Sequence, residues 1–277
     1  MKISAICNFP RRIKDLVIGR PAPELAPKWV TVSGGLGRGI RIFVNNRCHQ
    51  MVAGAFDHFI YEAVADVGFD FAGKCVWDVG AHIGYNSLVF AKVVGPRGKV
   101  IAFEPNKFNI ERFRMHMKGN ADLAARISLI PCAVGESECE QIFRFSNDVD
   151  RGRSAGSYID RGTLPGDRTP SAIYESFVSE RIQLVSIDEL IRGRNLPVPD
   201  LMKIDVEGSE HETLLGARSL LQEQKPLLVM EIHNITCMFN VQRLLSNLGY
   251  ILRLIDDGTR SASRCFILAE GPAVNHR

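Results

Sequence analysis

The sequence predicts an α/β fold with a doubly wound, mostly parallel sheet, and three observations support this prediction. Short runs of apolar and β-branched residues alternate along the chain with segments whose apolar residues recur at helical spacing. A turn containing Gly80 and Gly84 joins the first core run to a helical segment. Acidic residues, namely Asp78, Glu104 and Asp205, stand at the ends of three runs. Strands that alternate with helices pair in parallel, so these ends are expected to meet at one edge of the sheet.

Composition and charge are those of an ordinary globular protein. The 277 residues suffice for one large α/β domain with a modest extension. Hydrophobic residues make up 45% of the chain, and the net charge of +3 gives no indication of nucleic-acid binding. The seven cysteines form no C-x-x-C pair and are expected to be reduced thiols. Arg11 and Arg12 are not followed by an apolar signal core, and no run is long enough to span a bilayer, so we expect a cytoplasmic protein without stable membrane insertion.

Residues 1–54 are expected to form an N-terminal appendage, and residues 55–277 a catalytic domain. Within the appendage, two short strands are predicted at 29–32 and 40–44, among stretches rich in Pro, Gly and basic residues. The basic residues could contact an anionic substrate or simply form solvated surface. Apolar residues then recur at helical spacing over 55–69, which predicts an amphipathic helix before the first core strand.

The catalytic domain is predicted to alternate strands and helices. The strands are expected at 75–78, 99–103, 127–132, 181–185, 200–206, 226–232, 250–255 and 264–268. The helices are expected at 55–69, 84–92, 108–118, 186–191 and 239–248, with a further helix after Ser209. Ser186 with Glu189, and Ser209 with Glu212, have the spacing of capping boxes. A short Asp-Asp-Gly turn joins the last two strands, which are expected to form an antiparallel hairpin.

Residues 146–180 break this alternation, because Gly, Ser, Arg, Asp and Pro dominate and no period survives. A long irregular insertion in a compact domain is either a working lid or a plain loop, and the sequence leaves both open. Its position before a core strand would place it over the mouth of the site. Arg153 and Tyr158 are therefore candidates for binding sugar hydroxyl groups or a phosphate.

The strand, glycine turn and helix at 75–92 predict a nucleotide site, because glycines allow close approach of the backbone and a helix N-terminus offers free N–H groups. A dinucleotide fingerprint needs three glycines, whereas only Gly80 and Gly84 are present. Asp78 would repel a pyrophosphate but suits a ligand with an ammonium and a sulfonium group. Glu104 can accept hydrogen bonds from both hydroxyl groups of a ribose. These features favour S-adenosylmethionine over NAD.

Three blocks of the sequence carry a family resemblance. They are V-W-D-V-G-A-H-I-G-Y-N-S at 76–87, I-A-F-E-P-N at 101–106 and D-L-M-K-I-D-V-E-G-S-E-H-E-T-L-L-G-A at 200–217. Over roughly residues 75–270 the chain resembles the FkbM family of S-adenosylmethionine-dependent methyltransferases. The resemblance implies a class I methyltransferase, Rossmann-like fold, with a seven-stranded, mostly parallel sheet, an antiparallel edge hairpin and helices on both faces. It also implies methyl transfer to a hydroxyl oxygen of a small molecule, such as a sugar or glycosylated natural product.

The strand ends and the resemblance together give the expected cofactor-binding residues. They are Asp78, Gly80, Ala81, Gly84, Tyr85, Asn86, Glu104, Pro105, Asn106, Ala133, Val134 and Asp205. Asp78 and the N–H groups near Gly80 are expected to hold the methionine part of the cofactor. The resemblance places Ala133 and Val134 along the adenine.

His233 and Asp205 are the candidate catalytic residues. His233 follows a predicted strand, and histidine is suited to taking a hydroxyl proton near neutral pH; Asp205 is the competing candidate for this role. The residues expected to contact the acceptor are Glu207, Glu231, Arg153 and Tyr158. Asp205 and Glu207 could alternatively organise the turn that follows their strand. With Glu231 and His233 they also offer the oxygen-rich donors that Mg²⁺ prefers, so Mg²⁺ is a further candidate cofactor.

Other functions remain open on the sequence alone. An NAD(P)-dependent oxidoreductase shares the strand-turn-helix unit, and a non-catalytic binding protein could retain the fold. A methyltransferase acting on nucleic acid is a third alternative. We expect no nucleic-acid partner, because an N-P-P-Y-type block is absent where I-D-V-E stands and the charge is small. A homo-oligomer is compatible with the sequence.

Overall fold

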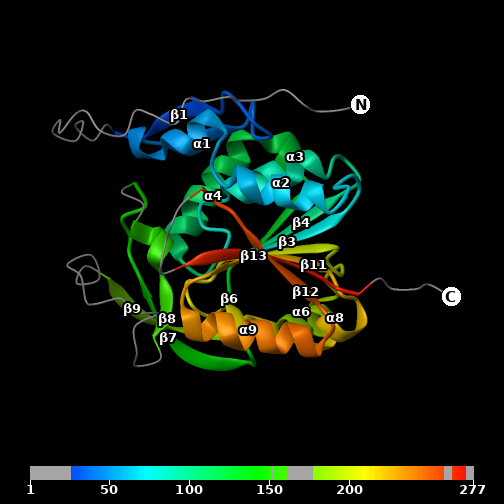
Figure 1. Cartoon of the computed structure of the whole chain (residues 1–277). Helices are drawn as coiled ribbons and strands as arrows, with labels where there is room; N and C mark the ends of the chain where they lie inside the picture. The colour runs from blue at the N-terminus through cyan, green and yellow to red at the C-terminus, as the bar shows by residue number, and fades with distance from the viewer. Residues whose placement is uncertain (1–25, 151–152, 161–176, 259–263, 273–277) are drawn as a thin grey trace.

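The computed structural model describes residues 26–150, 153–160, 177–258 and 264–272, and these form a seven-stranded sheet with helices on both faces (Figure 1). In spatial order the strands are β12 (Ile251–Ile255), β13 (Cys265–Glu270), β11 (Leu227–Ile232), β10 (Leu201–Ile204), β3 (Cys75–Val79), β4 (Lys99–Phe103) and β5 (Ile127–Ile130). The strands from β11 to β5 are parallel, whereas β13 is antiparallel to both β11 and β12. The predicted mostly parallel sheet with an antiparallel edge hairpin is confirmed.

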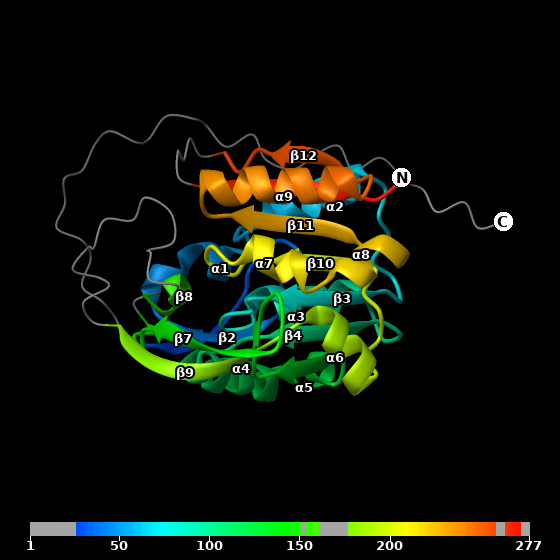
Figure 2. The ribbon, with the colours of Figure 1, turned by 90° about the horizontal axis from the view of Figure 1, so that it is seen from below.

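The chain starts this sheet near its centre and extends it in both directions. From β3 it adds β4 and β5 on one side, then crosses over to add β10 and β11 on the other. Figure 2 shows β10, β3 and β4 side by side. The strand order therefore reverses between β3 and β10, and ligands of open α/β sheets bind at such a point, outside the carboxyl ends of the strands. Across this pair Lys203 lies opposite Asp78.

Helices cover the sheet from both sides. They are α1 (His49–Ala53), α2 (His58–Asp66), α3 (Tyr85–Val93), α4 (Lys107–Gly119), α5 (Ala121–Ala124), α6 (Ile187–Arg194), α7 (Glu210–Leu215), α8 (Arg218–Glu223) and α9 (Ile235–Asn247). Helices α2 and α3 lie on one face, and α6, α8 and α9 on the other (Figure 1). Two short 3₁₀ helices complete the set, η1 (Asn46–Cys48) and η2 (Arg153–Gly156). Within the described part of the chain, no helix combines the length and the apolar character needed to cross a membrane.

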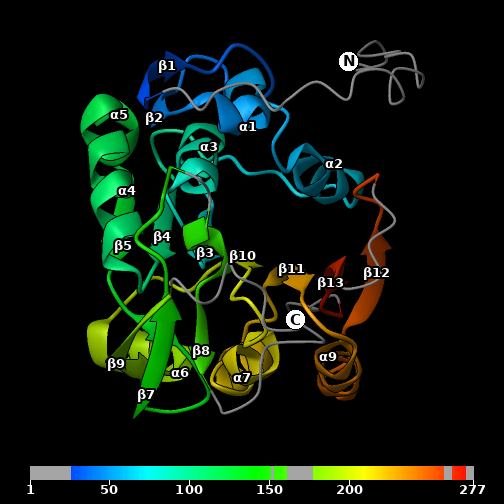
Figure 3. The ribbon, with the colours of Figure 1, turned by 90° about the vertical axis from the view of Figure 1, so that its left-hand side faces the viewer.

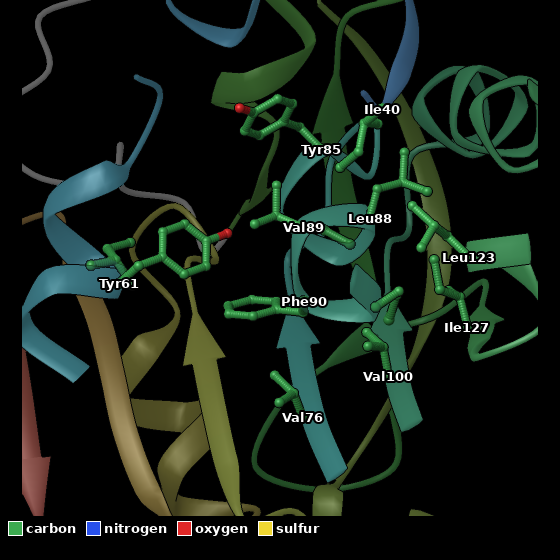
Figure 4. Close-up of a cluster of buried hydrophobic side chains, with 14 of the residues drawn as sticks. Ile40, Tyr61, Val76, Tyr85, Leu88, Val89, Phe90, Val100, Leu123 and Ile127 are labelled. Carbon is green, nitrogen blue, oxygen red and sulfur yellow. The ribbon is translucent and has the colours of Figure 1, made fainter. Parts of the chain in front are cut away.

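Each face of the sheet has its own apolar cluster. Successive side chains of a strand point to opposite faces, so Val76 packs in the cluster beneath α3, whereas Trp77 packs in the cluster beneath α6 and α9. In the first cluster the rings of Tyr61 and Phe90 lie 5.4 Å apart between centroids (Figure 4). By the same alternation, Lys203 and Asp78 point toward the face of α2 and α3. These two charged residues are therefore buried under the first helix layer.

The two strands predicted near the N-terminus pair as an antiparallel hairpin, β1 (Lys28–Thr31) and β2 (Arg41–Val44). With α1 they lie beside α3 (Figure 3). Ile42 and Val44 of β2 belong to the apolar cluster beneath α3. Asn120, after α4, accepts a hydrogen bond from the N–H of Arg41 at 2.8 Å. The hairpin thus shares the core of the larger sheet, and the division at residue 54 stays a prediction.

A second sheet stands beside the first, and of its residues only 181–185 were predicted to form a strand. Its order is β6 (Ala133–Val134), β9 (Val178–Val185), β7 (Cys139–Phe145) and β8 (Tyr158–Asp160). Residues 158–160 and 178–180 were expected to be irregular, but they are strands. Their pairing depends on β7, where Arg144 lies opposite both Tyr158 and Ser179, and such tertiary pairing overrides local composition. Within the predicted insertion, residues 151–152 and 161–176 lie outside the described part of the structure.

Candidate active site

A cavity of about 280 Å³ lies where the strand order reverses. Its walls include the last residues of β3 and β4, the residues just after β10, and Glu231 near the end of β11. Residues before and after the sheet complete it, from the loop before α2 to η2 and β8. Among the predicted site residues, those that line the cavity are Gly80, Ala81, Tyr85, Asn86, Glu104, Pro105, Ala133, Val134, Tyr158, Asp205, Glu207 and Glu231.

Glu104 lies in the cavity wall directly after β4 and is 5% exposed. Its Oε1 accepts hydrogen bonds from the N–H of Asn106 at 2.9 Å and from Nδ2 of Asn109 at 3.1 Å, and its Oε2 accepts one from the N–H of His82 at 2.8 Å. Burial raises the pKa of Glu104 to about 7, although these hydrogen bonds act in the opposite direction. A carboxylate has about four acceptor sites, so one remains for a ligand hydroxyl group.

Asp78 lies beneath the cavity and is fully buried. Its Oδ2 accepts a 2.6 Å hydrogen bond from Ser87 of α3, and its Oδ1 lies 3.7 Å from Nζ of Lys203. Among the described residues, Oδ1 has no hydrogen-bond partner. Burial raises the pKa of Asp78, against the influence of Lys203. The structure therefore does not bring Asp78 to the cavity wall, where it was expected to contact the cofactor directly.

The glycine turn is shaped by packing as much as by access to a ligand. Gly80 has a φ of +86°, and a Cβ atom there would lie 1.8 Å from the carbonyl oxygen of Asp205. Gly84 has a φ of +81°, and a Cβ atom there would lie 2.1 Å from the ring of Phe113. The N–H groups of Gly80 and Ala81 both donate to the carbonyl oxygen of Phe103. They are thus engaged within the chain, contrary to the expectation that they hold the cofactor.

Asp57, which sequence reasoning missed, supplies an acid to the cavity wall instead. Its Oδ2 accepts a 2.8 Å hydrogen bond from Nδ2 of Asn86, whose Oδ1 accepts one from the hydroxyl group of Tyr61 at 2.9 Å. Burial raises the pKa of Asp57. The predicted helix at 55–69 placed Asp57 inside its first turn, whereas the observed helix α2 begins at His58. Asp57 makes no cap hydrogen bond from its side chain, and the residue lines the cavity.

Lys203 of β10 lies between two acids, Asp78 of β3 and Asp205, which directly follows β10. Its Nζ is 3.2 Å from Oδ2 of Asp205 and 3.7 Å from Oδ1 of Asp78. Burial lowers the pKa of Lys203, but Asp205, Asp78 and Asp57 outweigh this effect and raise it above its ordinary value. In return, Lys203 and His233 overcome the burial of Asp205 and lower its pKa. Asp205 is therefore ionised at neutral pH.

His233 follows β11 and lies behind the cavity wall, with 6% of its surface exposed. Its Nδ1 is 2.7 Å from Oε1 of Glu210, a fully buried acid at the start of α7. Its Nε2 faces three carboxylates, those of Glu207 at 3.5 Å, Glu231 at 3.6 Å and Asp205 at 3.7 Å. Burial lowers the pKa of His233, but Glu210 and these acids prevail and raise it to about 10. A histidine that is already protonated at neutral pH cannot take a proton, so this arrangement does not support His233 as the base.

The structure also bears on the predictions for Asn106, for Arg153 and for the two capping boxes. Asn106 caps α4 by accepting a hydrogen bond from the N–H of Phe108, and it is not part of the cavity wall. Arg153 lies in η2, and its side chain is outside the described part of the structure. The capping box of Ser186 is confirmed. The one expected at Ser209 is wrong, because that side chain makes no cap hydrogen bond and lines the cavity instead.

The charge of the cavity wall is negative. Among the described residues that line it, the acids are Asp57, Glu104, Asp205, Glu207 and Glu231, and the permanently basic residues are Lys203 and Arg264. Burial lowers the pKa of His82 to about 4, so this histidine adds no positive charge at neutral pH. Burial raises the pKa of Glu104 and that of Glu231 to about 7, so these two acids are only partly ionised at neutral pH. Five acids against two basic residues still favour a cationic ligand and disfavour a pyrophosphate.

The sheet is doubly wound and has a reversed edge strand. Its cavity lies at the switch point, and an acid, Glu104, directly follows β4 in the cavity wall. These features define a class I methyltransferase fold. Residues 78–252 match the methyltransferase FkbM domain. The chain therefore belongs to the FkbM family of S-adenosylmethionine-dependent methyltransferases.

The individual relatives share about a third or less of their aligned residues with this chain. The chain is 30% identical over 171 residues to hexuronic acid methyltransferase AglP of Haloferax volcanii, a match that covers 62% of this chain and 61% of that protein. It is 26% identical over 184 residues to the AMB antimetabolite synthetase AmbE of Pseudomonas aeruginosa, covering 57% of this chain and 8% of that protein. The chain thus spans about three fifths of the first relative and a small part of the second. Among solved structures, methyltransferase FkbM of Methylobacillus flagellatus KT is similar in fold, with a TM-score of 0.51 and 22% identity over 73% of this chain and 44% of that chain.

Proposed function

We propose that the protein transfers a methyl group from S-adenosylmethionine to a hydroxyl oxygen of a sugar or a glycosylated small molecule. The observation that carries this proposal is the acidic wall of the cavity, which includes Glu104 and Asp57. The sulfonium and ammonium groups of the donor suit such a wall, whereas the pyrophosphate of a nicotinamide cofactor does not.

The donor has a partner in the chain for each of its parts. The free acceptor site of Glu104 would receive a ribose hydroxyl group. Ala133 and Val134 offer an apolar surface for the adenine. Asp57 replaces Asp78 as the acid for the ammonium group, because its carboxylate lines the cavity and that of Asp78 does not. Asp78 instead holds Lys203 beneath the site.

The acceptor would lie against Asp205, Glu207 and Tyr158, which line the same cavity. A sulfonium methyl group is already a strong electrophile, so the main task of the site is to align the acceptor oxygen with it. As the new C–O bond forms, the C–S bond breaks and sulfur keeps the electron pair. The hydroxyl proton would pass to the carboxylate of Asp205 or Glu207, while His233 holds these acids in place.

A sugar is the acceptor class that the comparisons support, since AglP is a hexuronic acid methyltransferase. Carboxylates and a tyrosine are suitable partners for sugar hydroxyl groups. Arg264 lines the same cavity, where it pairs with Glu231 at 2.8 Å, and it offers a partner for an acidic sugar.

The proposal is tested by measuring cofactor binding and methyl transfer together. S-adenosylhomocysteine should bind by calorimetry and NADH should not. Labelled methyl groups should pass from S-adenosylmethionine to members of a panel of hexuronic acids, neutral sugars and glycosides, and the position of the label should be an ether oxygen. Binding of NADH alone would overturn the cofactor assignment. Transfer to tRNA in preference to every sugar would overturn the acceptor class.

A further inference from the structure

We propose that Asp205, Glu231 and His233 form a binding site for a divalent metal ion at the wall of the cavity, with Mn²⁺ preferred over Mg²⁺. The site itself is independent of the methyl acceptor, and its catalytic role rests on the function proposed above. One ligand atom from each of the three residues can be chosen so that all lie within 4.8 Å of one another. These residues follow or end neighbouring strands β10 and β11, so the sheet fixes their spacing.

The distances at Nε2 of His233 suit an ion better than direct contacts. Nε2 lies 3.7 Å from Oδ1 of Asp205 and 3.6 Å from Oε1 of Glu231, beyond the range of hydrogen bonds. Two donors that each bind one ion at about 2.1 Å lie roughly 3 to 4 Å apart. Within the described part of the chain, Nε2 makes no hydrogen bond although its residue is 6% exposed. Oε2 of Glu207 lies 3.5 Å from the same nitrogen, so three carboxylates face Nε2. A divalent ion would displace the proton that His233 carries there and replace these long ion pairs with direct bonds.

The second ring nitrogen is held as metal-binding histidines require. Nδ1 is 2.7 Å from Oε1 of Glu210, and a carboxylate behind the histidine fixes which nitrogen faces the metal. Glu210 is itself immobilised, because it accepts hydrogen bonds from the N–H of Gly208 at 2.8 Å and from Sγ of Cys237 at 3.2 Å. A fully buried glutamate with three donors has no role in binding the acceptor, and orienting His233 explains its position.

The two carboxylates are also available to an ion. Asp205 directs Oδ2 to Lys203 and leaves Oδ1 on the side of His233. Glu231 bonds Arg264 through Oε1 at 2.8 Å, but the side chain of Arg264 is 47% exposed and can withdraw toward solvent or toward an acidic acceptor. Two carboxylates and one imidazole fit Mn²⁺ better than Mg²⁺, because imidazole binds first-row transition metals and Mg²⁺ prefers an all-oxygen shell.

An ion there would bind the acceptor oxygen and make its proton easier to remove. The carboxylate of Glu207, 3.5 Å from Nε2 of His233, would then receive that proton in place of Asp205. The methyl group passes from sulfur to this oxygen, and sulfur leaves as a neutral thioether. The ion expected from the sequence was Mg²⁺, whereas the donors of Asp205, Glu231 and His233 favour Mn²⁺.

The test titrates the EDTA-treated full chain with Mn²⁺ alone, without any methyl donor, and follows free Mn²⁺ by electron paramagnetic resonance. One Mn²⁺ should bind per chain, and Mg²⁺ should compete only at concentrations at least about tenfold higher. Glu231→Gln and His233→Gln should each weaken binding about tenfold or more, and Glu210→Gln about tenfold. Glu223→Gln and His49→Gln, at exposed residues that are not part of the cavity wall, are the matched controls and should bind as the unchanged protein does.

A further readout does not depend on variants that could fail to fold. Pulsed resonance spectra of Mn²⁺ in the unchanged protein should show coupling to one imidazole nitrogen. Absence of this coupling, absence of binding, or unchanged binding in Glu231→Gln and His233→Gln would each overturn the site. Glu104→Gln separates the two proposals, because it should weaken S-adenosylhomocysteine binding by about tenfold to a hundredfold and leave Mn²⁺ binding unchanged. A chain that binds Mn²⁺ but no methyl donor would refute the proposed function and leave the metal site standing.

Discussion

Nδ1 of His233 lies 2.7 Å from Oε1 of Glu210, and this contact joins the residue after β11 to the first residue of α7. Both side chains are buried. Removing the acid in Glu210→Ala leaves the imidazole and the N–H of Gly208 without their partner, so the free energy of unfolding should fall by about 3 to 5 kcal/mol. Urea unfolding measures this loss. The exposed Glu223→Ala should change it by less than about 0.5 kcal/mol, and equal effects of the two variants would contradict the role given to Glu210.

Glu104→Gln should weaken binding of S-adenosylhomocysteine by about tenfold to a hundredfold. A charged acceptor of a ribose hydroxyl group contributes about 1.5 to 3 kcal/mol, and the amide retains the shape of the side chain. Isothermal titration calorimetry gives the dissociation constant. The exposed Glu136→Gln serves as control, and an affinity unaffected by Glu104→Gln would remove the ribose assignment.

Cofactor binding should strengthen as the pH rises from about 6 to about 8. Burial raises the pKa of Glu104 to about 7, and the protonated acid is a poorer acceptor for a hydroxyl group. Below this pKa the affinity should fall by up to about tenfold per pH unit, and binding should release a proton. Calorimetry in buffers with different heats of ionisation detects that proton, and Glu104→Gln should abolish its release.

The raised pKa of Glu104 strengthens cofactor binding as the pH rises, but it lowers the stability of the folded chain over the same range. The pKa of Glu104 is higher in the folded chain than its ordinary value of 4.5, so folding favours the protonated form. Its contribution to stability is therefore largest below about pH 4.5, and it is lost as the pH rises through about 7.

Asp57→Asn and Asp78→Asn should separate cofactor contact from structural support. Asp57 lines the cavity, so its amide variant should reduce affinity for S-adenosylmethionine with a small change in unfolding free energy. Asp78 is fully buried beside Lys203, so its variant should lower the unfolding free energy by roughly 3 kcal/mol. Thermal unfolding and calorimetry on both variants provide the comparison. The reverse result would restore the prediction that Asp78 contacts the cofactor.

Sequence patterns predicted the main sheet because its strands are buried runs bounded by turns. The ends of those strands fixed Glu104 and Asp205 at the switch point, and both line the cavity. The second sheet escaped prediction because β8 is only three residues long and Ser179 and Glu180 of β9 are polar, so both strands depend on pairing with β7. Asp57 escaped because the predicted helix at 55–69 included it, whereas α2 begins at His58, and its partner Asn86 is 29 residues away in sequence. Contacts of this kind are set by tertiary packing, which no local period records.

Gly80→Ala should be far more destabilising than a comparable change elsewhere. Gly80 has a φ of +86°, and the added Cβ atom would lie 1.8 Å from the carbonyl oxygen of Asp205, so β3 and the residues after β10 would have to separate. Gly68 is the matched control, because it has a φ of +76° and no atom within 4 Å of an added Cβ. Gly68→Ala should cost only the left-handed strain of about 1 to 2 kcal/mol, whereas Gly80→Ala should cost roughly 3 kcal/mol more. Urea unfolding of both variants measures the difference, and equal losses would show that close approach to Asp205 does not select glycine here. Since the separation would also move Asp205 in the cavity wall, Gly80→Ala protein that still folds should bind S-adenosylhomocysteine more weakly than Gly68→Ala protein.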